Sequence, residues 1–316
     1  MDHIIHKMLS VFIVTILLFS CTEAPDKSEQ TGFNHDKNKT LDRSSYLETM
    51  PDKPLHLLFI HHSVGAQLLA DKGPVPKKNL LYKHHPNGGG LRRLLEENNY
   101  IVHEATYGSE IGEKTDVCHW NAKFRNQLEK IIITKHQNEY FADNTRNQIV
   151  MFKSCYPNSL IKARGDEPGD ADSCEKTITN FKAAYNALLS HLSSQPETLF
   201  VVLTAPPFAK PAPERVVTFK DKGFLLASDD IENVGRRARE FNNWLKDRES
   251  GWLKDYPFKN IAVFDLYDVL TDNGASNWSM YPSREGRDSH PNSEGNTKAA
   301  QELIQFLNNA VIGFRS

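Results

Sequence analysis

Five short, predominantly apolar segments recur along the chain, and stretches with helical periodicity lie between most of them. The apolar segments are residues 55–61, 101–107, 148–153, 199–204 and 261–265. Runs of this length are typical of strands buried on both faces, and strands that alternate with helices favour a parallel sheet. We therefore predict an α/β fold, a three-layer α/β/α sandwich around a five-stranded, mainly parallel sheet.

Apolar residues at helical spacing indicate where the helices lie. They fall within residues 91–95, 178–192, 234–245 and 299–311. Asn292 and Ser293 precede the last of these segments, and either side chain suits the N-cap position of a helix.

The first 20 residues have the pattern of a targeting signal. Lys7 is followed by an apolar run from Met8 to Phe19, and Ser20-Cys21 ends that run. The run is shorter than a comfortable membrane span, which takes about 20 apolar residues. A charged start, an apolar stretch and a small residue before a cysteine resemble the signal peptide of bacterial lipoproteins. This resemblance implies cleavage before Cys21 and attachment of a lipid to its thiol.

The segment after the signal is polar and too poor in apolar residues to offset the entropy of ordering it. We therefore predict a signal peptide at residues 1–20, a flexible tether at 21–52 and one domain at 53–316. The expected location is the cell envelope of a bacterium, where the lipid holds the domain on an extracytoplasmic face, periplasmic or surface.

The net charge is −2, from 38 basic and 40 acidic residues. Binding of nucleic acid needs a clustered basic excess, so we expect no nucleic-acid partner. We expect the chain to act as a monomer whose partners are the membrane, through the lipid, and a small ester.

Three cysteines remain besides Cys21, namely Cys118, Cys155 and Cys174. In a compartment that allows disulfides, they can form one pair and leave one free thiol, and the sequence leaves the pairing open. The chain has no CxxC motif, and its adjacent histidine pairs lack the spacing of metal ligands on a helix. We therefore expect no metal and no cofactor.

Polar residues follow three of the predicted strands, at the edge where open α/β sheets bind their ligands. Ser63 follows the first strand, Gly108 the second and Asn158 the third, and His290 precedes the final helix. This order resembles the SGNH (GDSL-type) hydrolase superfamily, over residues 54–312. The resemblance implies a flavodoxin-like fold, with Ser63 as the nucleophile and His290 as the base. It also implies an oxyanion hole made by Ser63, Gly108 and Asn158.

The sequence departs from the family pattern at two positions. The usual Gly-Asp-Ser is here His61-His62-Ser63, and the usual acidic residue three positions before the catalytic histidine is here Arg287. Asp288 lies two positions before His290 instead. The sequence therefore leaves two alternatives, a triad completed by Asp288 or a dyad of Ser63 and His290.

The resemblance implies ester hydrolysis, in which a base activates a serine and fixed donors stabilise the tetrahedral intermediate. We predict a serine esterase that removes acyl groups, acetyl foremost, from carbohydrate or a related ester. His62, Trp278 and Tyr281 are the predicted substrate contacts. The alternatives are an O-acyltransferase acting on polysaccharide and a non-catalytic, carbohydrate-binding lipoprotein. The sequence does not specify the sugar, the ester position or the face of the membrane.

Overall fold

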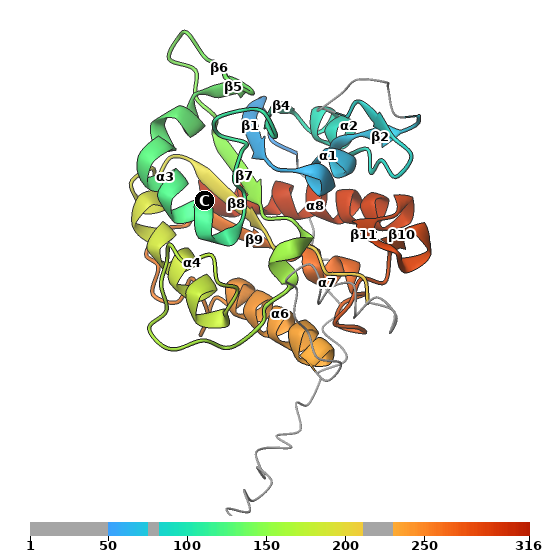
Figure 1. Cartoon of the computed structure of the whole chain (residues 1–316). Coiled ribbons are helices and arrows are strands. Elements are labelled where there is room, and N and C mark those ends of the chain that lie inside the picture. Colours follow the sequence, from blue (N-terminus) through green and yellow to red (C-terminus); the bar gives the residue numbers. More distant parts are fainter. Residues whose placement is uncertain (1–49, 75–81, 211–229) are drawn as a thin grey trace, which may run out of the picture. The chain divides into compact units, whose positions relative to one another are not determined.

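A five-stranded parallel sheet forms the centre of the protein, seen here in a computed structural model that describes residues 50–74, 82–210 and 230–316 (Figure 1). Its strand order is β4-β1-β7-β8-β9, and every neighbouring pair is parallel. The strands are β1 (Leu55–Ile60), β4 (Tyr100–Ala105), β7 (Ile149–Lys153), β8 (Leu199–Leu203) and β9 (Ile261–Phe264). In chain order this is the 2-1-3-4-5 arrangement of flavodoxin-like sheets. The predicted fold class is confirmed.

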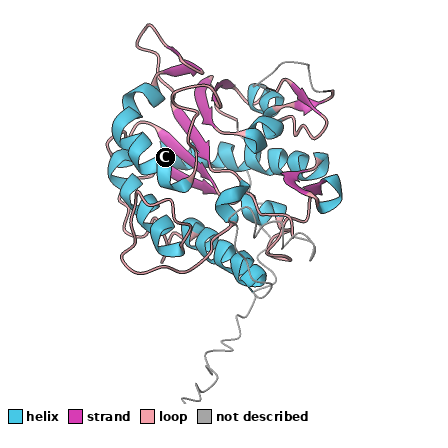
Figure 2. Cartoon of the chain, in the orientation of Figure 1, coloured by secondary structure: helices cyan, strands magenta, loops and turns pink. Residues whose placement is uncertain are grey.

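Helices cover both faces of the sheet (Figures 1 and 2). One apolar cluster joins one face to α1 (Ser63–Leu69), α2 (Leu91–Glu97), α7 (Leu266–Leu270) and α8 (Ser293–Arg315). A second cluster joins the other face to α3 (Val117–Ile132), α4 (Ile178–Ser193) and α6 (Asp230–Lys246). Side chains alternate along a strand, so Leu57 lies in the first cluster and Leu58 in the second. The inner strands therefore contribute apolar side chains to both clusters.

Three two-stranded sheets and two 3₁₀ turns lie outside the central sheet in the described residues. Two-stranded sheets pair β2 (Asp71–Lys72) with β3 (His84–His85), β5 (Thr134–His136) with β6 (Glu139–Tyr140), and β10 (Pro282–Ser283) with β11 (Asp288–Pro291). Two 3₁₀ turns are η2 (Tyr156–Ser159) and η3 (Arg284–Gly286). In η3, Arg284, Glu285 and Gly286 all have positive φ, at 50°, 55° and 82°. This tight reversal leads the chain from β10 into β11.

The predicted strands match the observed ones to within two residues at each end. All four predicted helices are present, and Asn292 caps α8 by accepting a hydrogen bond from the Gly295 N–H at 2.9 Å. Helix α3 was not predicted, although Val117, Trp120 and Phe124 lie at helical spacing and are all buried. Polar residues between them weaken the apolar pattern.

The predicted signal peptide and Cys21 lie outside the described residues, as does most of the predicted tether. Near the end of the tether, Pro51 already contacts the domain, because its carbonyl accepts a hydrogen bond from the Asn99 side chain at 2.8 Å. Within the described ranges, no helix is both long enough and apolar enough to cross a membrane.

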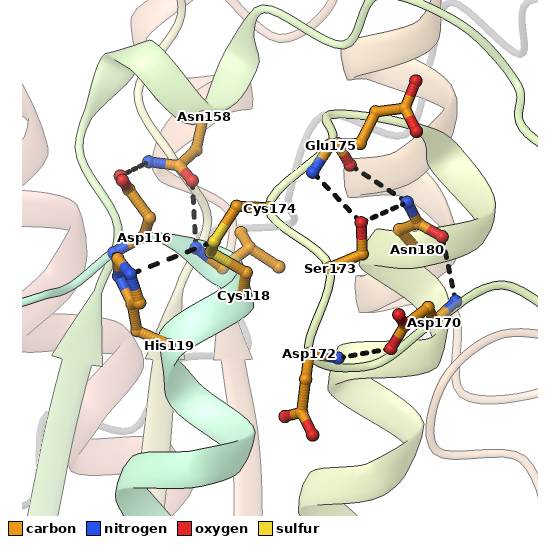
Figure 3. The surroundings of a disulfide bond; sticks show 11 residues. Asp116, Cys118, His119, Asn158, Asp170, Asp172, Ser173, Cys174, Glu175 and Asn180 are labelled. Atoms are coloured by element: carbon orange, nitrogen blue, oxygen red, sulfur yellow. Dashed lines mark hydrogen bonds between the residues drawn. A yellow bond between two sulfur atoms is a disulfide. The ribbon is translucent and has the colours of Figure 1, made fainter.

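A disulfide joins Cys118, in the first turn of α3, to Cys174, in the loop before α4 (Figure 3). Cys155 keeps a free thiol. The bridge spans 56 residues of sequence, and closing a loop of this size restricts the unfolded chain substantially. This pairing is one of those that the sequence left open.

We expect the double variant Cys118→Ala/Cys174→Ala to lose about 2 to 4 kcal/mol of the free energy of unfolding, because the unfolded chain regains that freedom. Urea unfolding of the oxidised proteins measures the loss. Cys155→Ala is the control, since it removes a thiol and no bridge. Equal stability of the double variant and the parent would contradict the pairing.

Candidate active site

Ser63, His290 and Asp288 form a continuous chain of hydrogen bonds. His290 Nε2 lies 2.8 Å from Ser63 Oγ, across 227 residues of sequence. His290 Nδ1 lies 2.6 Å from Asp288 Oδ1. Because Nδ1 faces a carboxylate, it carries the ring proton and donates it, which leaves the Nε2 lone pair to accept the Ser63 O–H. The imidazole is therefore oriented as a base toward Ser63.

The extended backbone of β11 explains why an acid two positions before the histidine reaches it. Side chains at positions i and i+2 of a strand project from the same face, so Asp288 and His290 point the same way. The backbone N–H of His290 also donates to Asp288 Oδ1, at 3.0 Å. The sequence left open a triad with Asp288 or a dyad of Ser63 and His290. The observed contacts are those of the triad.

The environment of Asp288 favours its ionised form. Partial burial disfavours the charge, but hydrogen bonds from the backbone and ring of His290, together with the charge of Arg284, outweigh it and lower the pKa of Asp288. The Arg284 guanidinium approaches Asp288 Oδ2 at 4.0 Å. A charged carboxylate beside Nδ1 stabilises the imidazolium that forms when His290 takes a proton.

The topology of the sheet surrounds Ser63 with residues from neighbouring strands. Ser63 begins α1 just beyond the carboxyl end of β1, and β1 lies between β4 and β7. Cys155, just beyond β7, places its Sγ 3.7 Å from Ser63 Oγ. Beyond β4, Tyr107 lines the same cavity as Ser63. Burial raises the pKa of Tyr107.

Ser63, Asp288 and His290 open into a cavity of about 910 Å³. Three tyrosines, Tyr82, Tyr107 and Tyr156, form part of its wall. The ring of Tyr156 meets the His290 imidazole edge-on, with 5.0 Å between the ring centroids. The remaining wall is mostly polar and includes Gln67, Asn87 and Glu285, together with Pro86 and Pro282. The cavity thus combines aromatic surfaces with hydrogen-bonding groups next to the Ser63 hydroxyl.

The structure does not leave Gly108 and Asn158 free to act as predicted. The Gly108 N–H donates to the Glu113 carboxylate at 2.6 Å. The Asn158 amide nitrogen donates to Asp116 at 2.7 Å and to the Cys155 carbonyl at 3.2 Å, while its oxygen accepts from the Val117 N–H (Figure 3). Asn158 is 2% exposed, so its contacts attach η2 to the start of α3. Both amide hydrogens of Asn158 are thus used within the protein, which leaves none for the oxyanion-hole role predicted for it.

None of the three predicted substrate contacts lines the cavity. Trp278 is 5% exposed and packs in an apolar cluster with Phe208 and Val234. Tyr281 packs against the core beside α8, and neither residue lines the cavity. Closeness to His290 in sequence misled both predictions, because Trp278 is buried and Tyr281 packs, partly buried, against the core. Their aromatic rings contribute to packing.

His62, the third predicted contact, lies behind the cavity wall. Its ring stacks on Tyr107, with 3.8 Å between centroids and 25° between planes. Its Nε2–H donates to the Gly112 carbonyl at 2.8 Å. His62 does not line the cavity, so it supports Tyr107 instead of touching a ligand.

Within the described ranges, the candidate metal-ligating cluster is Cys118, His119 and Cys174. Both of its thiols are joined in the disulfide, so they offer no thiolate for a metal.

Tyr107, Cys155 and Gln67 belong to this site but were not among the predicted site residues. Tyr107 and Cys155 follow β4 and β7, which flank the strand that precedes Ser63. Position after a strand that neighbours β1 is therefore the signal that could have found them. Gln67 lies one helical turn after Ser63, and that spacing alone could have placed it on the same side of α1.

No family model matches the chain, and no curated protein matches it. Among solved structures, the chain is similar to a catalytic mutant of an acetylxylan esterase from Geobacillus stearothermophilus. Their sequences are 12% identical, the match covers 82% of this chain and 96% of that one, and the TM-score is 0.39. It is also similar to a carbohydrate esterase described as having divergent catalytic and non-catalytic binding functions. That match has 12% identity, covers 82% of this chain and 66% of the other, and has a TM-score of 0.35.

The buried position of His62 predicts a pH dependence of stability. Burial lowers the pKa of His62 from 6.5 to about 4, and the hydrogen bond to Gly112 opposes this only in part. Between these values the unfolded chain binds a proton that the folded protein does not, so stability falls as the pH decreases from 6.5 toward 4. Above this window His62 makes no contribution to the slope.

We expect His62→Phe, which keeps an aromatic ring against Tyr107, to flatten this dependence. Urea unfolding of both proteins across the window measures the slope of stability against pH. Parallel slopes for the two proteins would show that His62 is not held neutral by the fold.

Proposed function

We propose that the protein is a serine esterase of the SGNH type that removes acyl groups, acetyl foremost, from carbohydrate or a related ester. The observation that carries this proposal is the hydrogen-bonded chain from Asp288 through His290 to Ser63, which opens into a large cavity. A serine hydroxyl is a weak nucleophile until an adjacent base accepts its proton, and this arrangement supplies that base.

The proposed reaction has two halves. Ser63 Oγ attacks the ester carbonyl while its proton passes to His290 Nε2, and Asp288 stabilises the resulting imidazolium. The imidazolium then gives this proton to the departing alcohol oxygen, which leaves the acyl group on Ser63. In the second half, water gives a proton to His290 and attacks the acyl carbon. His290 returns the proton to Ser63 Oγ as the carboxylic acid leaves.

The tetrahedral intermediates carry negative charge on the former carbonyl oxygen, and fixed donors must stabilise it. The backbone N–H of Ser63 suits this task, since the first N–H groups of a helix have no partner within the helix. The Tyr107 hydroxyl belongs to a residue of the same cavity wall and is a second candidate donor. Gly108 can contribute when the exposed Glu113 side chain moves away from its N–H.

The cavity supports a carbohydrate ester as substrate. Tyr82, Tyr107 and Tyr156 offer flat apolar faces together with hydroxyl groups, and Asn87 and Gln67 add polar contacts. This combination suits a sugar ring, which has apolar faces and hydrogen-bonding edges. A binding protein without catalytic activity would not need a base aligned on Ser63, so the geometry favours an enzyme over that alternative.

Ser63→Ala tests the proposal. We expect the parent protein to release acetate from an acetylated oligosaccharide, and the variant to lose at least about 10⁴-fold in kcat, because the nucleophile is gone. Enzymatic assay of free acetate measures the rate. Retained activity in Ser63→Ala would exclude Ser63 as the nucleophile. Transfer of acetyl to an added oligosaccharide, without release of acetate, would identify an acyltransferase instead.

Asp288→Asn tests the third member of the chain. An amide at this position can donate to Nδ1 and so favour the wrong tautomer of His290, and we expect kcat to fall by about 10³- to 10⁴-fold. Asp272→Asn is the matched control, because Asp272 pairs with Lys298 and does not line the cavity. Near-parental kcat in Asp288→Asn would point to a dyad of Ser63 and His290.

We also propose that a lipid on Cys21 anchors the protein in the cell envelope. The support is the sequence pattern of residues 1–21. Cys21→Ala is expected to move the protein from the membrane fraction to the soluble fraction of a bacterial host. An unchanged distribution would contradict lipid anchoring at Cys21.

A further inference from the structure

His61 is a fully buried histidine two residues before Ser63, and the proposed reaction does not use it. Its ring makes two polar contacts. Nδ1 lies 3.0 Å from the backbone oxygen of His62, and Nε2 lies 3.1 Å from Oε1 of Glu104 in β4. The side chain of Arg92, in α2, contacts the other carboxyl oxygen of Glu104. These contacts hold the ring between β4 and the backbone that leads into Ser63.

The partners of the ring decide which of its nitrogens carries a hydrogen toward the backbone. The backbone oxygen of His62 only accepts, so the hydrogen of that contact belongs to Nδ1. A bare Nδ1 would set two lone pairs against each other at 3.0 Å, in a buried place. The carboxyl group of Glu104 serves the other contact, because it can accept from Nε2 or donate to it. His61 therefore donates from Nδ1 to the His62 carbonyl.

The His62 carbonyl and the Ser63 N–H belong to one peptide group. That group is planar and trans, so its oxygen and its hydrogen point in opposite directions. A contact that fixes the oxygen therefore also fixes the direction of the Ser63 N–H, which is an oxyanion donor in the proposed reaction. A hydrogen bond to the oxygen also polarises the peptide group and strengthens its N–H as a donor.

The first turn of α1 keeps the imidazole in this place. The Ala66 N–H donates to the same His62 oxygen at 3.0 Å, so the helix and the ring hold that oxygen together. Gly65 has no side chain, and a Cβ there would collide with His61 Cβ and lie 2.9 Å from its Nδ1. Glycine at this position thus leaves the room that the imidazole fills.

We propose that His61 is a positioning residue, which directs the Ser63 N–H toward the oxyanion by donating from Nδ1 to the His62 carbonyl. This inference rests on the proposed esterase function. It extends that function by giving a role to the residue that replaces the glycine of the usual Gly-Asp-Ser. The charge on the ester oxygen develops in the transition state, so a well-directed N–H matters more there than in the bound substrate.

Two substitutions of His61 separate the two contacts of its ring. His61→Asn keeps a donor nitrogen one bond from Cγ, as Nδ1 is, whereas His61→Gln keeps one two bonds from Cγ, as Nε2 is. Release of acetate from an acetylated oligosaccharide measures kcat and KM. We expect His61→Gln to lose about 10²-fold in kcat with KM nearly unchanged, because the loss is confined to the transition state. His61→Asn should keep kcat within about tenfold of the parent, because it can still donate to the His62 carbonyl.

The matched control is His103→Gln. His103 is a buried histidine of β4 whose ring contacts His56 and does not line the cavity, so this variant should keep the parental kcat. Thermal unfolding checks that each variant is folded. ¹⁵N NMR of the parent protein tests the hydrogen bond without any substitution at the site. The His61 signals, assigned by their absence from His61→Gln, should show Nδ1 with its hydrogen attached.

The outcomes separate this inference from the proposed function. Equal losses of kcat in His61→Asn and His61→Gln, parental kcat in His61→Gln, or a bare Nδ1 in the parent would overturn the inference and leave an active esterase. A parent protein that hydrolyses no ester would overturn the esterase proposal, and this inference with it.

Discussion

The two-residue spacing of Asp288 and His290 in an extended strand is the constraint on which the site depends. It lets one short element, β11, supply both the carboxylate and the imidazole, with Asp288 Oδ1 accepting from the ring and the backbone of His290. The positive-φ turn of η3 sets the start of that strand. A helical backbone at this point would rotate successive side chains by about 100°, so Asp288 would point away from the ring.

The sheet supplies the other half of the geometry. Because β1 lies between β4 and β7, the segments that follow these three strands meet at one edge. Ser63, Tyr107 and Cys155 come together there, and α1 carries Gln67 into the same cavity wall. The disulfide and the contacts of Asn158 stabilise the adjoining start of α3 and η2. The apolar clusters on both faces thus hold the strand ends that carry the polar residues of the site.

The sheet could be predicted from sequence because long-range burial leaves a local pattern. Each strand is a short apolar run, and the observed bounds lie within two residues of the predicted ones. The proximity of Ser63 and His290 was also predicted, through their order along the chain. Whether Asp288 reaches His290 could not be read from the sequence, because the same residues in a turn would point apart. The contact depends on η3, whose positive φ angles at Arg284 and Glu285 have no clear signal in the residues themselves.

The predictions that failed all required knowledge of where a side chain points. Asn158 follows β7 as expected, but its amide is used to hold Asp116 and the Val117 N–H. Trp278 is near His290 in sequence, yet it is directed into the core. The cysteine pairing, which the sequence left open, depends on the position of α3, a helix that was not predicted. Spacing identifies the rim of the sheet, whereas packing decides which residues at that rim face the cavity.

Covalent labelling by a fluorophosphonate tests the central claim most directly, because this reagent reacts with a serine hydroxyl that a base has activated. Mass mapping of the labelled protein is predicted to find the adduct on Ser63, with labelling strongly reduced in His290→Ala and absent from Ser63→Ala. Equal labelling of the parent and Ser63→Ala proteins, or an adduct at another residue, would contradict the account.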